Sequence, residues 1–155
     1  MNYIKNIRKK VGHDKIFLNF SGGILQKSGR ILLQRRSDKG TWGIPGGAIE
    51  LGESATEALI REYYEETGIK IKPLKLLNVY TKYTDCYPNG DEAQVITILY
   101  EVYSEDIYIN MEYKNVETLE LKFFNYDEIQ ELVLVNKQHE DMIKDFFENS
   151  CILGR

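Results

Sequence analysis

Residues 47–69 read GAIELGESATEALIREYYEETGI, and the interpretation of the whole chain starts from this stretch. Ser54 and Glu57 have the spacing of a capping box, in which each residue satisfies a backbone N–H of the other. Gly68 stands where a left-handed residue commonly ends a helix. The pattern therefore predicts a helix from Ala55 to Thr67.

One face of this helix begins apolar and ends acidic. Glu62, Glu65 and Glu66 continue an arc of about 120° in which Leu59 also lies. Like charges three or four residues apart on a helix repel each other by about 0.2–0.5 kcal/mol per pair. A cation that prefers oxygen ligands removes this repulsion, and Mg²⁺ suits carboxylates together with substrate phosphates. The alternative is a solvated acidic face on which Arg61 pairs with its glutamate neighbours.

The spacing of the polar and glycine residues distinguishes between these alternatives. It reads Gly47-x5-Glu53-x7-Arg61-Glu62-x2-Glu65-Glu66-x-Gly68 and resembles the signature of the Nudix hydrolases, with all seven fixed positions filled. At about 7% usage per residue type, seven such matches arise by chance about once in 10⁸ windows. The residues before the box, 42–47, also resemble the family's approach to it. Tyr63 departs from the pattern, since the family usually has an aliphatic residue there.

The resemblance implies an α/β fold, the Nudix-type α/β/α sandwich with a mixed β-sheet. Hydrophobic alternation and turn residues independently predict strands at 15–26, 31–34, 48–51, 74–84, 93–103 and 119–124, and helices at 126–132 and 136–149. We expect one domain over residues 1–149, with an N-terminal helix in 1–12 and the Nudix box at 47–69. Residues 150–155 are expected to form an untethered tail.

The resemblance also implies a reaction, the Mg²⁺-dependent hydrolysis of the pyrophosphate bond in a nucleoside diphosphate linked to another moiety. The product would be a nucleoside monophosphate, and Mn²⁺ could replace Mg²⁺. The expected metal ligands are Glu62, Glu65 and Glu66, which one helix face presents together. The expected catalytic residues are Glu53, Arg61, Glu65 and Glu66.

Two further positions take roles from the family. Glu53 lies just before the helix and is expected either to ligate a metal or to accept the proton of the attacking water. Arg61 is expected to hold a carboxylate, most simply Glu53 or Glu65, through the fork of its guanidinium group. A backbone carbonyl of the Gly46–Gly47 pair, with Gly46 preferred, is expected to join the metal shell.

Residues outside the box are interpreted more plainly. The family often uses one more acid, and Glu92, Glu117 and Glu120 are each interpreted as solvent-facing rather than as that acid. Strand alternation lets only one of Arg35 and Arg36 face a site, where it could reach a phosphate or ribose. The tyrosines and Trp42 are each expected to fill half-buried strand faces, while one of Trp42 and the hairpin tyrosines, Tyr87 among them, could instead stack on a nucleobase. The two histidines, His13 and His139, are interpreted as structural or surface residues.

Composition limits the class of protein. The 155 residues are 43% hydrophobic and 28% charged, which argues against disorder and low-complexity classes. No apolar run approaches 18 residues, so no transmembrane helix is predicted, and a cytoplasmic location is expected. Cys86 and Cys151 are too few to predict a disulfide framework. The net charge of −4 argues against general nucleic-acid binding, so RNA is expected at most as a 5′-triphosphate end.

The sequence leaves the identity of the substrate open. A nucleotide sugar such as ADP-ribose, a nucleoside triphosphate, a dinucleoside polyphosphate and an RNA end all contain the bond that the box handles. A Nudix-like module that binds a nucleotide without cleaving it is the alternative function, although such a module usually lacks one of the box carboxylates. Homodimers are common in the family, which makes a homodimer one expected assembly.

Overall fold

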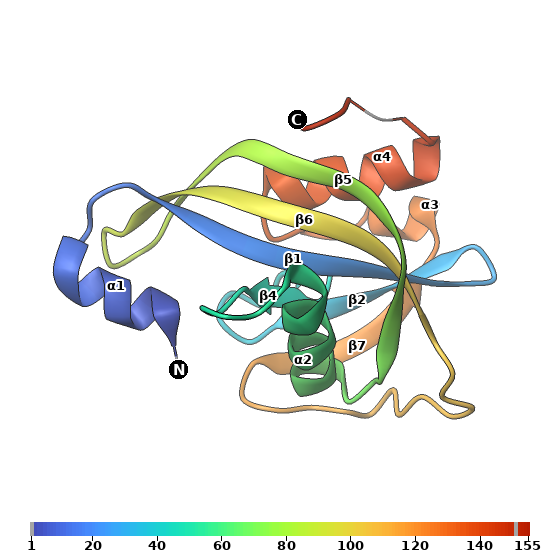
Figure 1. Cartoon of the computed structure of the whole chain (residues 1–155). Coiled ribbons are helices and arrows are strands. Elements are labelled where there is room, and N and C mark those ends of the chain that lie inside the picture. The colour runs from blue at the N-terminus through green and yellow to red at the C-terminus, as the bar shows by residue number, and fades with distance from the viewer. Residues whose placement is uncertain (1, 151) are drawn as a thin grey trace.

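The computed structural model describes residues 2–150 and 152–155; Met1 and Cys151 lie outside the described residues. Its elements (Figure 1) are α1 (Tyr3–Val11), β1 (Ile16–Lys27), β2 (Arg30–Arg36), β3 (Trp42–Gly43), β4 (Gly46–Ala48), α2 (Ala55–Thr67), β5 (Ile71–Cys86), β6 (Glu92–Ser104), β7 (Thr118–Phe124), α3 (Tyr126–Ile129) and α4 (Lys137–Glu148). Of these, α2 has the bounds that its capping residues predict.

The strands form a mixed sheet, as expected. Its main path runs β3-β2-β1-β6-β5, while β4 pairs with β1 and β7 pairs with β2. The β1–β6 pair is parallel and the β5–β6 hairpin is antiparallel. The turn of this hairpin contains Asn89-Gly90, a pair typical of tight hairpin turns, and Gly90 has a φ of +93° that favours glycine.

Helices cover both sides of the sheet, so the α/β/α sandwich is confirmed (Figure 1). Alternating residues of β2 divide between two cores. Leu32 packs with Leu59 and Tyr63 of α2, whereas Leu33 packs with Met142 and Ile143 of α4. Strand β2 is therefore packed between α2 on one face of the sheet and α4 on the other.

Several strands are longer than predicted, notably β5, which runs Ile71–Cys86 in place of 74–84. Two other predicted elements extend too far along the chain. The strand expected at 48–51 is β4 at Gly46–Ala48, because the chain turns at Gly52 and the Glu50 N–H donates to the Glu53 carboxylate instead of to a strand. The helix expected at 126–132 ends at Ile129. Beyond it the backbone pairs with Trp42, whose N–H donates to the carbonyl of Val133.

The prediction of an untethered C-terminal tail is wrong. The Arg155 guanidinium binds Asp141 at 3.2 Å and Asp145 at 3.1 Å, and both aspartates are more than nine-tenths buried on α4. Asn78 of β5 donates to the carbonyl of Ile152 and accepts from the N–H of Gly154. These contacts seat the tail against β5 and α4.

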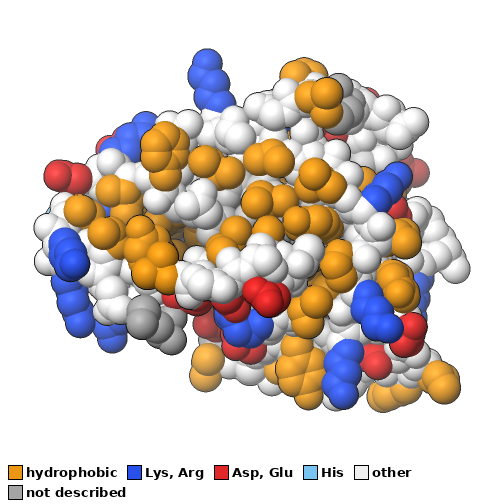
Figure 2. Space-filling view, in the orientation of Figure 1, with side chains coloured by type: hydrophobic (Ala, Val, Ile, Leu, Met, Phe, Trp, Pro, Cys, Tyr) orange, Lys and Arg blue, Asp and Glu red, His pale blue; other side chains and the backbone are white. Residues whose placement is uncertain are grey.

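One face of the sheet carries hydrophobic side chains at the surface. Figure 2 shows them gathered over the middle of the face that Figure 1 presents. Phe17 of β1 is 60% exposed, and Leu74 and Leu76 of β5 are 59% and 56% exposed.

The homodimer expected from the family resemblance remains a prediction. No helix among the described residues is long and apolar enough to cross a membrane.

Candidate active site

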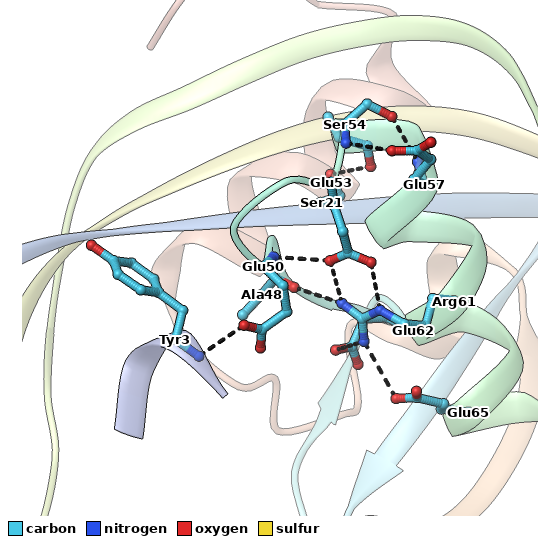
Figure 3. A network of polar contacts seen from close by, with 11 residues as sticks. Tyr3, Ser21, Ala48, Glu50, Glu53, Ser54, Glu57, Arg61, Glu62 and Glu65 are labelled. Atoms are coloured by element: carbon cyan, nitrogen blue, oxygen red, sulfur yellow. Dashed lines mark hydrogen bonds and ion pairs between the residues drawn. The ribbon is translucent and has the colours of Figure 1, made fainter. Parts of the chain in front are cut away.

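Local capping fixes where α2 begins. The Ser54 side chain accepts from the N–H of Glu57, and the Glu57 carboxylate accepts from the N–H of Ser54 (Figure 3). At the other end Gly68 is left-handed, with a φ of +70°, and its N–H donates to the carbonyl of Tyr64. The register of the acidic face is thus set by residues at the helix ends.

Arg61 lies at the centre of a network of carboxylates (Figure 3). Its Nε and Nη2 atoms donate to the two Glu53 carboxylate oxygens, each at 2.7 Å. Its Nη1 donates to Glu62 at 2.7 Å, and Nη2 also donates to the carbonyl of Ala48 at 3.1 Å. The hydrogen bonds from Arg61 lower the pKa of Glu53 to about 2. The predicted fork contact with Glu53 is therefore present in the structure.

Glu62 packs directly against the glycine that opens the box. A Cβ atom on Gly47 would lie 2.3 Å from the carboxyl carbon of Glu62, so only glycine leaves room for this carboxylate. Burial raises the pKa of Glu62, and the hydrogen bond from Arg61 opposes the rise. Gly47 thus lets the backbone of β4 approach a specific carboxylate of α2.

Glu66 is a half-buried carboxylate that lies against the backbone of β4. Its Oε2 accepts from the N–H of Gly46 at 3.1 Å. Burial raises its pKa to about 8, and the neighbouring charges of Glu62 and Glu117 add to the rise. In contrast to Glu53, Glu66 forms no ion pair among the described residues.

Glu65 faces outward, and its side chain is 57% exposed at 3.5 Å from Arg61. The backbone at this end of α2 is held by the segment before β7. The carbonyl of Glu65 accepts from the Tyr113 hydroxyl at 2.8 Å and from the Asn115 amide at 2.6 Å. The carbonyl of Glu66 accepts from the Thr118 hydroxyl at 2.8 Å. These long-range hydrogen bonds therefore fix the backbone that carries the Glu65 and Glu66 side chains.

A cavity of about 450 Å³ opens beside α2. Such a volume fits a small-molecule site. Glu62 and Glu66 line it, and so does Glu117, an exposed loop residue. Among the three acids considered outside the box, Glu117 alone borders this cavity; Glu120 pairs with Arg35, and Glu92 pairs with Lys15. The pairing of β7 with β2 brings Glu117 here, and no sequence signal reveals that pairing.

The carboxylates offer the oxygen donors that Mg²⁺ prefers. Within residues 2–150 and 152–155, no three acidic, histidine or cysteine side chains are arranged as a finished metal site. The buried negative charge at Glu62 and Glu66 nevertheless fits a divalent cation, because each added carboxylate raises the cost of ionising the next. The donor set therefore fits the expected metal by chemistry.

Several other side chains reach the same cavity. Arg36 lines it and Arg35 does not, which confirms that only one of the pair faces the site. Tyr87 also lines it, whereas Trp42 packs edge-on against Phe124 in the core. The expectation of a structural role thus holds for Trp42, while Tyr87, one of the tyrosines considered for stacking on a base, borders the cavity.

Sequence reasoning also missed polar residues at the α4 side of the cavity. His139, expected to be structural, does accept the Ile44 N–H, yet it lines the cavity together with Asp85 and Asn136. Asn136 is recognisable as a helix N-cap, but nothing local indicates that Asp85 lies beside it.

Comparisons with known proteins agree with this geometry. Residues 18–146 match the family model described as NUDIX domain. An ADP-ribose pyrophosphatase of Methanocaldococcus jannaschii is 35% identical over 127 residues, covering 80% of this chain and 69% of the relative. A MutT-like protein of Streptomyces ambofaciens is 40% identical over 81 residues, covering 47% of this chain and 53% of the relative. This chain thus spans about half to two thirds of these two relatives.

A solved structure shows the same fold. The crystal structure of a NUDIX hydrolase from Nitrosomonas europaea superposes with a TM-score of 0.72 at 22% identity, and the alignment covers 88% of this chain and 77% of that one.

Proposed function

This chain belongs to the Nudix hydrolase family, whose pyrophosphohydrolases act on nucleoside diphosphate derivatives, and from this premise we propose its reaction. It uses Mg²⁺ to hydrolyse the pyrophosphate bond of a nucleoside diphosphate linked to another moiety, and it releases a nucleoside monophosphate. The substrate is a nucleotide sugar, such as ADP-ribose, or a nucleoside triphosphate.

The observation that carries this proposal is the gathering of three carboxylates at one cavity. Glu62 and Glu66 are held there with raised pKa values, and Glu117 adds a third negative charge. Such an arrangement lowers stability unless a cation occupies it. A protein site of this kind favours Mg²⁺, which binds few carboxylates and keeps places for substrate phosphates.

Glu62, Glu66 and the carbonyl of Gly46 would hold the metal at the cavity, and Glu65, which faces outward in this structure, would complete the ligand set from the same helix. When bound, the metal supplies neutralising charge for the pyrophosphate and lowers the pKa of an attacking water. The chain contributes the placement of these ligands: Gly46 and Gly47 meet the carboxylates of Glu66 and Glu62 from β4. Helix α2 and strand β4 thereby form one rigid support.

Glu53 has a positioning role in this proposal. Both its oxygens already accept from Arg61, one also accepts from the N–H of Glu50, and a pKa of about 2 makes it a weak proton acceptor at neutral pH. Glu53 therefore fixes Arg61, and Arg61 in turn fixes Glu62 through its third nitrogen. The predicted place of Glu53 in the metal shell remains a prediction.

The mouth of the cavity also suits an anionic substrate. Arg36 and Lys39 line it, and Arg36 is bound only loosely by Asp38, at 3.3 Å. One such cation can meet a phosphate that the metal leaves unpaired.

A product assay tests the proposal. Wild type is incubated with Mg²⁺, and separately with Mn²⁺, and ADP-ribose, other nucleotide sugars, nucleoside triphosphates, dinucleoside polyphosphates and 5′-triphosphate RNA. We expect release of a nucleoside monophosphate from one of the small-molecule classes. Glu65→Gln should reduce turnover by several orders of magnitude, because it removes a metal ligand. Glu131→Gln, an exposed residue that does not line the cavity, is the matched control and should keep wild-type turnover.

Full activity in Glu65→Gln would overturn the assigned ligand set. No product from any substrate with either metal would overturn catalysis, and nucleotide-dependent thermal stabilisation would then support the binding module.

A further inference from the structure

The cavity has a second polar region, at the start of α4, that the metal chemistry does not use. Asn136 caps α4, and its Oδ1 accepts from the N–H of His139 at 3.0 Å. Its Nδ2 donates to the two carboxylate oxygens of Asp85 at 3.1 and 3.4 Å. One side chain thus holds both neighbours, and all three residues line the cavity. We call this set the Asp85–Asn136–His139 wall.

His139 presents a hydrogen-bond donor to the cavity. The N–H of Ile44 donates to Nδ1 at 3.0 Å, so this nitrogen carries no proton and the proton of the neutral ring is on Nε2. Burial lowers the pKa of His139 to about 3, which keeps the ring neutral. A Cβ on Gly43 would lie 3.1 Å from the ring, so the absence of a side chain at Gly43 leaves space for the imidazole.

Asp85 presents acceptors. It forms no ion pair with a lysine or arginine in the part of the chain that the structure describes, and Asn136 uses only part of its acceptor capacity. A carboxylate of this kind, inside a cavity, favours a ligand that brings N–H groups. The wall therefore offers one N–H donor beside two carboxylate oxygens.

Much of the rest of this region is apolar, and Thr97 and Gln138, which also line the cavity, hydrogen-bond to each other. Ile44, Val95 and Met142 are all buried residues that line the cavity, and Val135 lies beside them. An apolar lining with a few fixed polar groups suits a flat heterocycle better than a sugar, since a sugar carries hydroxyls around its rim. The phosphates of the same ligand belong at the other end, by the carboxylates of α2.

We propose that the Asp85–Asn136–His139 wall reads the nucleobase and that it selects guanine. The proposal rests on the proposed function, because it concerns the nucleoside half of that substrate. Guanine carries N1–H and N2–H₂ side by side, which match the two Asp85 oxygens, and its O6 accepts from His139 Nε2–H. Adenine offers only its N6 amino group to Asp85 and leaves one carboxylate oxygen without a donor.

Binding of nucleoside monophosphates tests this directly, because they contain the base and one phosphate but no bond for the enzyme to cleave. Titration calorimetry of wild type with GMP, IMP and AMP in Mg²⁺ should give a dissociation constant for GMP that is about 10- to 100-fold lower than that for AMP, the range that one bidentate contact provides. IMP lacks the N2 amino group and should bind more weakly than GMP.

Substitution of Asp85 completes the comparison. Asp85→Asn replaces an acceptor by a donor, so the difference between GMP and IMP should disappear, and binding of AMP should change much less. Asp14→Asn, an exposed aspartate that does not line the cavity, is the matched control and should keep the wild-type ratios.

Three outcomes overturn the proposal: equal binding of GMP and AMP by wild type, a GMP-to-IMP ratio unchanged in Asp85→Asn, or no binding of any monophosphate. Hydrolysis separates this failure from that of the proposed function. Product release that survives with no base preference leaves the reaction standing and removes the base selection alone. Tight binding of GMP without hydrolysis of any substrate removes the reaction and leaves the base selection standing.

Discussion

The two ends of α2 hold carboxylates of the same motif in opposite electrostatic states. Glu53, at the start, has both oxygens bound by Arg61 and a pKa near 2. Glu66, near the end, is buried beside two other acids and has a pKa near 8. Arg61 pairs with Glu53 across seven intervening residues, whereas no arginine or lysine is paired with Glu66 among the described residues.

This difference separates positioning from chemistry. A carboxylate that is satisfied within the fold fixes its neighbours, whereas a carboxylate whose charge is unsatisfied favours a cation from outside. The first kind makes the fold more stable and the second makes it less stable, so the two ends should respond in opposite ways to substitution, pH and metal.

The largest effect is expected at the unsatisfied end. Glu66→Gln should lower turnover at least about a thousandfold, since a lost metal ligand withdraws several kcal/mol of transition-state stabilisation. It should also leave the metal-free protein as stable as wild type or more so, because the amide needs no charge in the buried site. Turnover in Mg²⁺ and thermal unfolding in EDTA measure the two quantities. A variant that is inactive because it unfolds would contradict this account.

The satisfied end should behave differently. Arg61→Lys removes the fork that binds Glu53 and Glu62 together, and an ammonium group cannot replace its geometry. We expect turnover to fall about 10- to 100-fold as Glu62 loses its position. The metal-free protein should lose about 1–3 kcal/mol of stability, measured by urea unfolding. Stability equal to wild type would show that the ion pair at this end is not structural.

The pH dependence of stability should also differ between the ends. The pKa of Glu66 is raised in the fold, so between pH 4.5 and 8 the folded state holds a proton that the unfolded state has lost, and stability falls as the pH rises. The contribution of Glu53 has the opposite sign and is lost only as the pH falls from about 4.5 toward 2. From pH 6 to 8.5 in EDTA, the Tm of wild type should fall by about 5 °C or more relative to Glu66→Gln.

Mg²⁺ should reverse this loss in wild type, because a cation that binds the ionised carboxylates stabilises the folded state. Parallel profiles for wild type and Glu66→Gln, with or without Mg²⁺, would show that Glu66 does not titrate as its surroundings indicate.

The sequence predicted those parts of the site that depend on nearby residues. The bounds of α2 follow from Ser54, Glu57 and Gly68, which act within one turn of each helix end. The contact between Arg61 and Glu53 is one of the two that the sequence predicted for the guanidinium fork, and Glu53 lies just before the N-cap of the helix that carries Arg61. These interactions are local, so the spacing of residues determines them.

The parts that sequence reasoning missed depend on contacts between distant segments. Glu117 reaches the cavity because β7 pairs with β2, and Asp85 meets Asn136 across 51 residues of chain. Arg155 is bound for a similar reason, since its partners are buried acids of α4. Alternation and capping patterns report which face a residue occupies, but they do not report which strand or helix lies opposite.

Substitution of Tyr63, which lies between the two ends of α2, is expected to give the smallest change in stability. The Tyr63 side chain is fully buried in the same core cluster as Leu59 and Val102, and its hydroxyl has no hydrogen-bond partner among the described residues. A buried hydroxyl without a partner costs free energy. Tyr63→Phe should therefore raise stability by about 1 kcal/mol, seen as a Tm higher by about 2–4 °C, without changing turnover.

The same variant sharpens the contrast between the two ends. Burial raises the pKa of the unpartnered Tyr63 hydroxyl, and the charge of Glu66 adds to the rise. If the two ends of α2 act independently, removal of the Tyr63 hydroxyl should change the stability of the fold. It should leave unaltered the pH dependence of stability that Glu66 contributes. A loss of stability would mean instead that the hydroxyl supports the buried carboxylate. The unsatisfied end of α2 would then include Tyr63, the one box position at which this chain departs from its family.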